Sequence, residues 1–327
     1  MTDATLPAAV PLRLPPRSAY AAPSSKSSKS TQRLKSSLTY YPIRPFAPLH
    51  VCMKDLTADI FHCDEDSPML ILLSPAKSLD FETPLPDGLA HTLPAFPAQT
   101  RALVQRMRSF APQDLASLMH ISDALAALNV GRFAAFRARP GAAHARQALL
   151  AFDGDVYDGL DARSLDAADL AWAQEHLAIL SGLYGVLRPL DRMQPYRLEM
   201  GTRLETDAGT GLYAYWGERI ARHLDRQVRR QPGEPLLLNL ASQEYFKAVD
   251  RKALRARVAE CVFEDWQGGA YKVVGFHAKR ARGRMARFAI QARAETLDAL
   301  KDFGADGYAY AARASTPDRL VFRRRAG

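Results

Sequence analysis

The chain has 327 residues, of which 47% are hydrophobic, and it carries a formal net charge of +9. This content is enough for a substantial buried core, and no apolar run reaches the eighteen residues that a membrane-spanning helix needs. The three cysteines, Cys52, Cys63 and Cys261, show no CxxC or Cys/His spacing, which argues against a disulfide or zinc framework.

Residues 1–68 differ in composition from the rest of the chain. Pro, Ser and Ala dominate up to about Pro48, and the stretch AAPSSKSSKSTQRLKSSL has neither helical nor alternating periodicity, which predicts a disordered extension. A second interpretation places the true translation start at Met53 or, preferably, at Met69, where MLILLSPAKSLD begins abruptly as an apolar strand. We therefore expect one domain over residues 69–327.

Helices are predicted for much of the first part of this domain. A short buried strand at residues 69–73 is followed by apolar residues three and four apart within residues 98–136, where Pro112 suits the first turn of a helix. Further helices are predicted at residues 142–151, 165–180 and 212–228.

Strand patterns concentrate toward the C-terminus. Residues 236–240 form an apolar run, and Ser242 is placed to cap a helix that continues to Asp250. CVFEDW and YKVVGF flank Gln267-Gly268-Gly269, which predicts a hairpin, and GYAYAA with RLVFRR predicts a second one. Five or six strands with helices between them predict an α+β fold in a single domain, with a mixed β-sheet surrounded by helices.

Familiar catalytic motifs are absent from the sequence. It has no GxxxxGK[ST], GxGxxG after a strand, HExxH or GxSxG, and no Cys/His cluster. The acidic run FDGDVYDGLD does not fit a calcium loop of the EF-hand type, because Asp158 replaces the glycine and Ser164 replaces the bidentate glutamate. We interpret these aspartates as turn-forming residues.

Basic residues are the more informative feature. Residues 69–327 hold 36 Lys/Arg against 29 Asp/Glu, and a basic folded domain attracts polyanions. GFHAKRARGRMARFAI places five cations within nine residues at a predicted strand–helix junction: Lys279, Arg280, Arg282, Arg284 and Arg287. An anion-binding helix start and a solvated basic helix both explain this segment.

Three cationic turns follow predicted strands. Lys77 follows the first strand, Lys247 follows residues 236–240, and Lys279 with Arg280 follows YKVVGF. Ligands of open α/β sheets collect at such strand ends. If the three strands are parallel neighbours, these cations converge on one cleft.

Five motifs in the same order make the sequence similar to the YaaA family of bacterial peroxide-stress proteins. They are SPAKSLD, GDVYDGL, LSGLYGVLRPLDRMQPYRLEMG, LASQEYFK and AKRARGRMARF, and the resemblance covers Met69 to about Arg325. It implies a cytoplasmic DNA-binding protein that limits iron- and peroxide-driven DNA damage. It also implies a basic cleft and a helix-hairpin-helix element, for which residues 125–133 are the candidate.

The resemblance implies that seven cations of this chain line the cleft: Lys77, Arg188, Arg197, Lys247, Lys279, Arg282 and Arg287. We add Arg280, because it lies in the same basic segment. The expected partner is the DNA phosphate backbone, read without sequence preference, because no recognition helix or zinc finger is evident. We expect no membrane partner, no cofactor and no metal.

An enzyme acting on a small anionic or nucleotide-like substrate in the same cleft is the alternative function. Its acid–base and anion-binding groups would be Ser74, Lys77, Asp191, Tyr196, Arg197 and Glu199. An iron-binding protein has little support, because the paired His/carboxylate spacing of iron sites is missing from residues 69–327.

Overall fold

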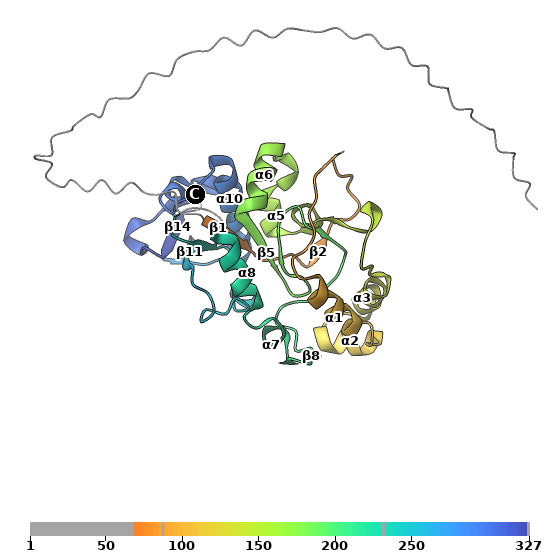
Figure 1. Ribbon diagram of the computed structural model, residues 1–327. Coiled ribbons are helices and arrows are strands. Elements are labelled where there is room, and N and C mark those ends of the chain that lie inside the picture. The colour runs from red at the N-terminus through yellow and green to blue at the C-terminus, as the bar shows by residue number, and fades with distance from the viewer. Residues whose placement is uncertain (1–68, 87, 230–232, 326–327) are drawn as a thin grey trace, which may run out of the picture. The chain divides into compact units, whose positions relative to one another are not determined.

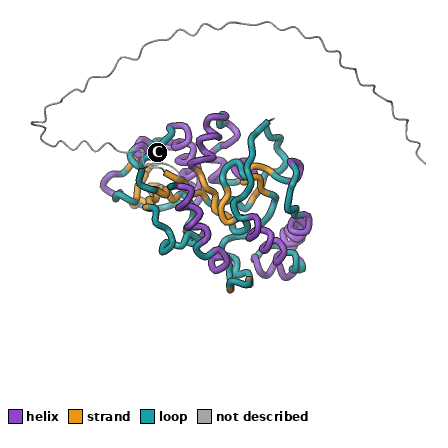
Figure 2. The backbone as a smooth tube through the Cα atoms, in the orientation of Figure 1, coloured by secondary structure: helices purple, strands orange, loops and turns teal. Residues whose placement is uncertain are grey.

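The computed structural model describes residues 69–86, 88–229 and 233–325. They belong to one compact unit, and the extension expected for residues 1–68 lies outside the described residues. Figure 1 shows this unit as a sheet with helices around it, and Figure 2 shows the strands in orange between purple helices.

The main sheet contains eight strands and is mixed, which confirms the expected sheet type. In spatial order β13-β14-β11-β10-β1-β5-β6, with β12 on the end of β11, its strands are β13 (Ala309–Tyr310), β14 (Arg319–Arg324), β11 (Arg257–Gln267), β10 (Leu236–Asn239), β1 (Met69–Leu73), β5 (Leu177–Ser181), β6 (Gly185–Leu187) and β12 (Ala270–Lys272). The five strands from β14 to β5 are parallel, whereas β6, β12 and β13 are antiparallel to their neighbours.

Strand β1 lies at the centre of the sheet. Its residues Met69–Leu73 are at most 2% exposed, because both faces of a parallel sheet are covered. Helices α6 and α8 both contact β1, and α10 contacts β11. In Figure 1, α6 and α10 lie above these strands and α8 lies below them.

The described residues contain ten α-helices. Their bounds are α1 (Pro97–Met107), α2 (Pro112–Met119), α3 (Asp123–Ala135), α4 (Ala148–Ala151), α5 (Asp155–Leu160), α6 (Ala167–His176), α7 (Leu212–Trp216), α8 (Arg219–Val228), α9 (Gln243–Phe246) and α10 (Gly275–Ala292). Three two-stranded sheets pair β2 (Ser78–Leu79) with β4 (Phe152–Asp153), β3 (Arg146–Gln147) with β7 (Arg192–Met193), and β8 (Glu205–Thr206) with β9 (Gly209–Thr210).

The sheet has a topological switch point between β1 and β10. After β1 the chain goes to β5 on one side, then crosses back so that β10, β11 and β14 lie on the other side. Parallel strands that part in this way leave a crevice at their carboxyl ends, where ligands of such sheets bind. The loops after β1, β5 and β10 meet at this carboxyl edge.

Helices α5 and α10 cross with their backbones almost in contact. A Cβ added to Gly283 would lie 1.8 Å from the Val156 carbonyl oxygen, and one added to Gly159 would lie 2.2 Å from the Arg280 carbonyl oxygen. Only residues without a side chain fit at such a crossing. The close approach at Gly283 is made by backbone of the protein itself.

Several sequence predictions hold in detail. The Gly268-Gly269 turn joins antiparallel β11 and β12, with φ values of 58° and 85°. β13 pairs antiparallel with β14, Pro112 begins α2, and Ser242 caps α9. Helix α9 ends at Phe246 rather than at Asp250.

Other predictions are wrong. The helix expected at residues 165–180 ends at His176, and the following residues form β5. The helix expected at residues 142–151 is replaced by a 3-10 turn at Ala142–His144, strand β3 and the short helix α4. Gly217, at φ 47°, divides the helix of residues 212–228 into α7 and α8. The hairpin expected at residues 125–133 is also wrong, because these residues lie inside the continuous helix α3. The turn between α2 and α3 occupies His120 to Ser122 instead.

Candidate functional site

Two serines, one from the loop after β1 and one from the loop after β10, are hydrogen-bonded to each other at the switch point. The Ser242 amide donates to the Ser74 hydroxyl oxygen at 2.8 Å, and the two hydroxyl oxygens lie 3.2 Å apart. These bonds hold the SPAK turn, and with it Lys77, against the loop that leads into α9. The expectation that β1 and β10 are parallel neighbours is confirmed.

A small pocket lies beside these serines. We call it the carboxyl-edge pocket, and it is lined by Pro75, Ala76, Lys77, Tyr196, Arg197, Leu198, Glu199 and Tyr245. Its volume is about 20 Å³. Lys77 is exposed and has no ion pair within the described part of the chain, whereas the Arg197 Nε lies 2.8 Å from Glu199 Oε1. The structure thus brings two of the expected cations together.

A third cation, Arg132, approaches from α3. Burial lowers the pKa of the half-buried Arg132, and the nearby charge of Arg197 lowers it further. Among the described residues no acidic side chain pairs with Arg132 and no hydrogen bond of its guanidinium is formed. An arginine whose charge is destabilised by a second cation indicates a place where an anion would be favourable.

Three buried tyrosines surround this site: Tyr196 and Tyr245 line the pocket, and Tyr157 bonds to the SPAK turn. The Tyr157 hydroxyl donates to the Ser74 carbonyl at 3.0 Å, and the Tyr196 and Ser181 hydroxyl oxygens lie 2.6 Å apart. Burial raises the pKa of Tyr157, Tyr196 and Tyr245 well above the ordinary value, and for Tyr157 and Tyr245 the proximity of Tyr196 adds to this. Burial thus favours the protonated form of these phenols, and the hydrogen bonds of Tyr157 and Tyr196 position the loops.

Arg188 and Lys247 lie away from the lining of this pocket. Arg188 follows β6, which is antiparallel to β5, so it lies toward the amino edge of the sheet; its guanidinium is 3.7 Å from Glu175 and 3.9 Å from Asp191. The Lys247 ammonium lies 4.9 Å from the centre of the Tyr213 ring. Asp191, expected in the enzyme alternative, is buried beside Arg188, where burial raises its pKa.

The cations of α10 face acidic partners. Lys279 lies 3.5 Å from Asp155, Arg280 and Arg284 lie 4.0 and 3.8 Å from Asp306, and Arg287 donates to the carbonyls of Leu160 and Asp161 at 2.9 and 2.8 Å. The Lys279 partner Asp155 follows Gly154, where an added Cβ would lie 3.6 Å from Ala76 of the SPAK turn. The strand before α10 is antiparallel, so the expected third parallel turn is wrong.

Arg282 is a separate case on the same helix. It is partly buried, and burial lowers its pKa while the charge of Glu260 raises it. It has no ion pair within 4.0 Å in the described residues. The structure does not bring Arg282 to the carboxyl-edge pocket, whose lining contains no residue of α10.

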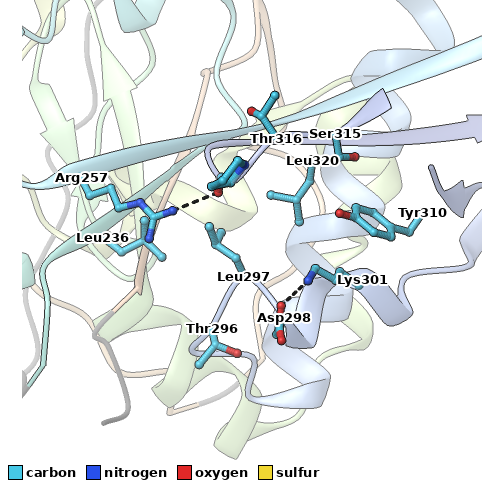
Figure 3. A pocket seen from close by; sticks show the side chains of 11 residues that line it. Leu236, Arg257, Thr296, Leu297, Asp298, Lys301, Tyr310, Ser315, Thr316 and Leu320 are labelled. Carbon is cyan, nitrogen blue, oxygen red and sulfur yellow. Dashed lines mark hydrogen bonds and ion pairs between the residues drawn. The ribbon is translucent and has the colours of Figure 1, made fainter. Parts of the chain in front are cut away.

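A larger cavity lies at the opposite edge of the sheet. It measures about 590 Å³ and is lined by residues near the amino ends of β10, β11 and β14, among them Leu236, Arg257 and Leu320. Figure 3 shows its charged groups engaged with neighbours: Arg257 donates to the Pro317 carbonyl at 3.0 Å, and Lys301 pairs with Asp298. Volume alone therefore does not mark the better site, because Lys77, which has no ion pair among the described residues, lies in the carboxyl-edge pocket.

Metal and thiol chemistry find little support in the described residues. No group of three His, Cys, Asp or Glu side chains there could hold a metal ion. Cys261 is buried in β11, and burial raises the pKa of its thiol. A buried thiol with a raised pKa reacts poorly with peroxide, because the thiolate is the reactive form.

Sequence reasoning missed Arg132 as a site residue. Its segment is predicted to form the hairpin, and the neighbouring Phe133 is a core residue, so nothing local distinguishes Arg132 from a surface arginine. Its meeting with Arg197, 65 residues further along the chain, depends on how α3 packs.

Comparison with known proteins identifies the family. Residues 69–314 match the family described as "Peroxide stress protein YaaA". The chain belongs to this family. Relatives named "UPF0246 protein" include one from Delftia acidovorans, 66% identical over 258 residues, one from Paracidovorax citrulli, 65% identical over 257, and one from Variovorax paradoxus, 56% identical over 262. Each alignment covers 79% of this chain and 99–100% of the relative.

Membership of the YaaA family supports a role in the response to peroxide stress. The five motifs quoted from the sequence begin within the matched residues, and SPAK and the PYRLE stretch supply most of the carboxyl-edge pocket. Among the described residues, no helix is both long and apolar enough to cross a membrane.

Proposed function

We propose that this YaaA-family protein binds DNA in the cytoplasm and limits the damage that iron and peroxide cause to it. One observation carries the proposal: Lys77 and Arg197 line the carboxyl-edge pocket, where Glu199 is the single acid in the described lining, and Arg132 lies close enough to feel the charge of Arg197. Lys77 and Arg132 have no acidic partner among the described residues, and such cations are the groups that neutralise phosphates.

The size of the pocket favours a phosphate of a polymer over an enclosed substrate. A volume of about 20 Å³ has room for roughly one water molecule. A phosphate at the mouth of the pocket would reach Lys77 and Arg197, with the charge of Arg132 nearby, while its sugar and base remain outside. Such contacts fix the protein on the strand and read no sequence.

The helical pair α2–α3 supports the same proposal. Its turn contains His120 in the left-handed conformation at φ 51°, and Ser122 caps α3. We propose that this pair is the helix-hairpin-helix element of the family. In this chain its contribution to DNA binding would come through Arg132, which α3 places close enough to feel the charge of Arg197.

Fluorescence anisotropy with a labelled duplex at several salt concentrations tests the proposal. Arg132→Ala should weaken binding to unrelated sequences equally and reduce the slope of log affinity against log salt by about 0.9 for each phosphate that is no longer neutralised. Arg313→Ala is the matched control, because Arg313 is exposed and precedes β14 at the opposite edge. Equal slopes for wild type and Arg132→Ala would remove the pocket from the interface.

A small anionic ligand is the second candidate, and the position of the pocket at the switch point favours it. The anisotropy titration with labelled duplex also distinguishes a small anionic ligand from DNA as the partner. Inorganic phosphate or a nucleoside monophosphate that binds saturably and displaces DNA at micromolar concentration would make the small ligand the primary partner. If these small anions displace DNA only at the concentrations at which any salt does so, DNA is supported as the primary partner.

The stress role is tested in cells. A strain lacking the protein should accumulate more DNA lesions after a peroxide pulse, and an iron chelator given beforehand should reduce the difference. Wild-type protein should restore protection, whereas Arg132→Ala should restore it only in part. Full protection by a variant that no longer binds DNA would separate the stress role from DNA binding.

A further inference from the structure

Exposed apolar side chains concentrate around one hairpin. Trp266 is 37%, Val273 54% and Phe276 58% exposed, and they make up half of the six large hydrophobic residues exposed within the described chain. They lie at the end of β11, just after β12, and in the first turn of α10. With Tyr271, Lys272 and Arg325 they form what we call the hairpin surface.

Cations lie against the rings of this surface. The guanidinium of Arg325 is 4.4 Å from the centre of the Trp266 ring, and that of Arg323 is 4.4 Å from the centre of the Tyr271 ring. The two rings meet edge to face at 4.9 Å. Arginine over an aromatic face combines stacking with positive charge, and proteins use this combination to bind single-stranded nucleic acid.

The local acids are already engaged. Arg323 lies 2.8 Å from Glu264, and Arg324 lies 2.5 Å from the buried Asp265, which His277 also approaches at 3.2 Å. Lys272 and Arg325 have no acidic partner among the described residues. The hairpin surface therefore remains positive, which favours an anionic partner such as a nucleic-acid strand.

The hairpin surface rises from the same edge of the sheet as the carboxyl-edge pocket. β11 is parallel to β10, its residue Glu260 pairs with Asn239, and residues 261–267 continue beyond the end of β10. At 3.3 Å per residue this extension is roughly 20 Å long. The parallel strand β14 ends beside it, bringing Arg325 to the same place, and Figure 1 shows β11 and β14 side by side.

We infer that the hairpin surface binds unpaired bases of single-stranded DNA, with Trp266 and Phe276 as stacking platforms and Lys272 and Arg325 on the phosphates. The inference rests on the proposed DNA binding and adds a preference for single strands or opened duplex. Stacking is tolerant of sequence, because every base offers a flat face.

Anisotropy with a labelled twenty-nucleotide oligo(dT) and with a blunt duplex tests the inference in the full chain. Phe276→Ala should weaken oligo(dT) binding roughly tenfold, leave the salt slope unchanged because no charge is removed, and change duplex affinity less than twofold. Trp266→Phe should bind like wild type, and Trp266→Ala should lose about as much as Phe276→Ala. Leu93→Ala is the control, since Leu93 is 72% exposed and lies outside the hairpin surface.

The outcomes separate the two proposals. Oligo(dT) affinity that is unchanged in both Phe276→Ala and Trp266→Ala, while Arg132→Ala still weakens duplex binding, would overturn this inference and leave the proposed function intact. Wild type that binds neither DNA would overturn both. Phe276-dependent binding to vesicles of anionic phospholipid, with oligo(dT) binding unchanged in Phe276→Ala, would also overturn the inference and assign the surface to a membrane.

Discussion

Ser74 and Ser242 join the loops that follow β1 and β10, 168 residues apart in the sequence, at the switch point of the sheet. Ser74 accepts the Ser242 amide, and its own carbonyl accepts the Tyr157 hydroxyl. One residue thus fixes the SPAK turn to α9 and to α5. The position of Lys77 follows from these bonds.

Replacing Ser74 with Ala should lower the free energy of unfolding by about 1 kcal/mol, because the Ser242 amide loses its acceptor. It should also weaken duplex binding, since the turn that carries Lys77 becomes less constrained. Urea unfolding and anisotropy measure the two effects. Ser78→Ala is the control, because Ser78 is exposed in β2, directly after Lys77; an equal loss in both variants would contradict the role given to Ser74.

Gly283→Ala should destabilise the protein by about 1–3 kcal/mol or more, because the new methyl group would overlap the Val156 carbonyl. Gly131→Ala, in the exposed middle of α3 with no atom within 4 Å of the added Cβ, should instead stabilise it by about 0.5–1 kcal/mol. Thermal unfolding of the two variants gives shifts of opposite sign. Shifts of the same sign would mean that the α5–α10 crossing adjusts freely.

Arg287→Ala should reduce stability and leave DNA binding unchanged. The Arg287 guanidinium donates to the last carbonyls of α5, so its loss leaves those acceptors without their charged donor and costs about 1–3 kcal/mol. Urea unfolding should detect this loss, while the salt slope of duplex binding should match that of wild type. A flatter slope would instead place Arg287 on the phosphates, as the basic character of its segment predicts.

The contribution of Asp80 to stability should depend on pH. Burial alone would raise the pKa of this carboxyl, but hydrogen bonds from the Thr83 and Glu82 amides and from Arg163 outweigh it and hold the pKa well below the ordinary value. A depressed pKa means that the stabilisation is complete above the unfolded value of about 4 and is lost as pH falls below it. The difference in unfolding free energy between wild type and Asp80→Asn should therefore be constant from pH 8 to about 5 and shrink toward pH 3. A difference that stays constant down to pH 3 would contradict this.

Much of the fold was predictable because its signals are local. The glycine pair at residues 268–269 marks the hairpin, Pro112 marks the start of α2, and Ser242 marks the cap of α9. Strand β5 was missed because LAILS is a short apolar run that follows α6 without a proline or glycine. A strand buried on both faces has no alternation, so periodicity cannot distinguish it from the end of a buried helix.

The site was predictable only in part, and for a physical reason. The sequence by itself determined that cations follow β1 and β10 and crowd into α10, since residue type and strand order are properties of the chain. Tertiary structure alone decided which of these charges are already neutralised. Lys279 meets Asp155 and Arg287 meets the end of α5 across more than 120 residues, whereas Arg132 meets Arg197 and no acid among the described residues. Coulomb energy depends on separation in space and on burial, neither of which is encoded by spacing along the chain.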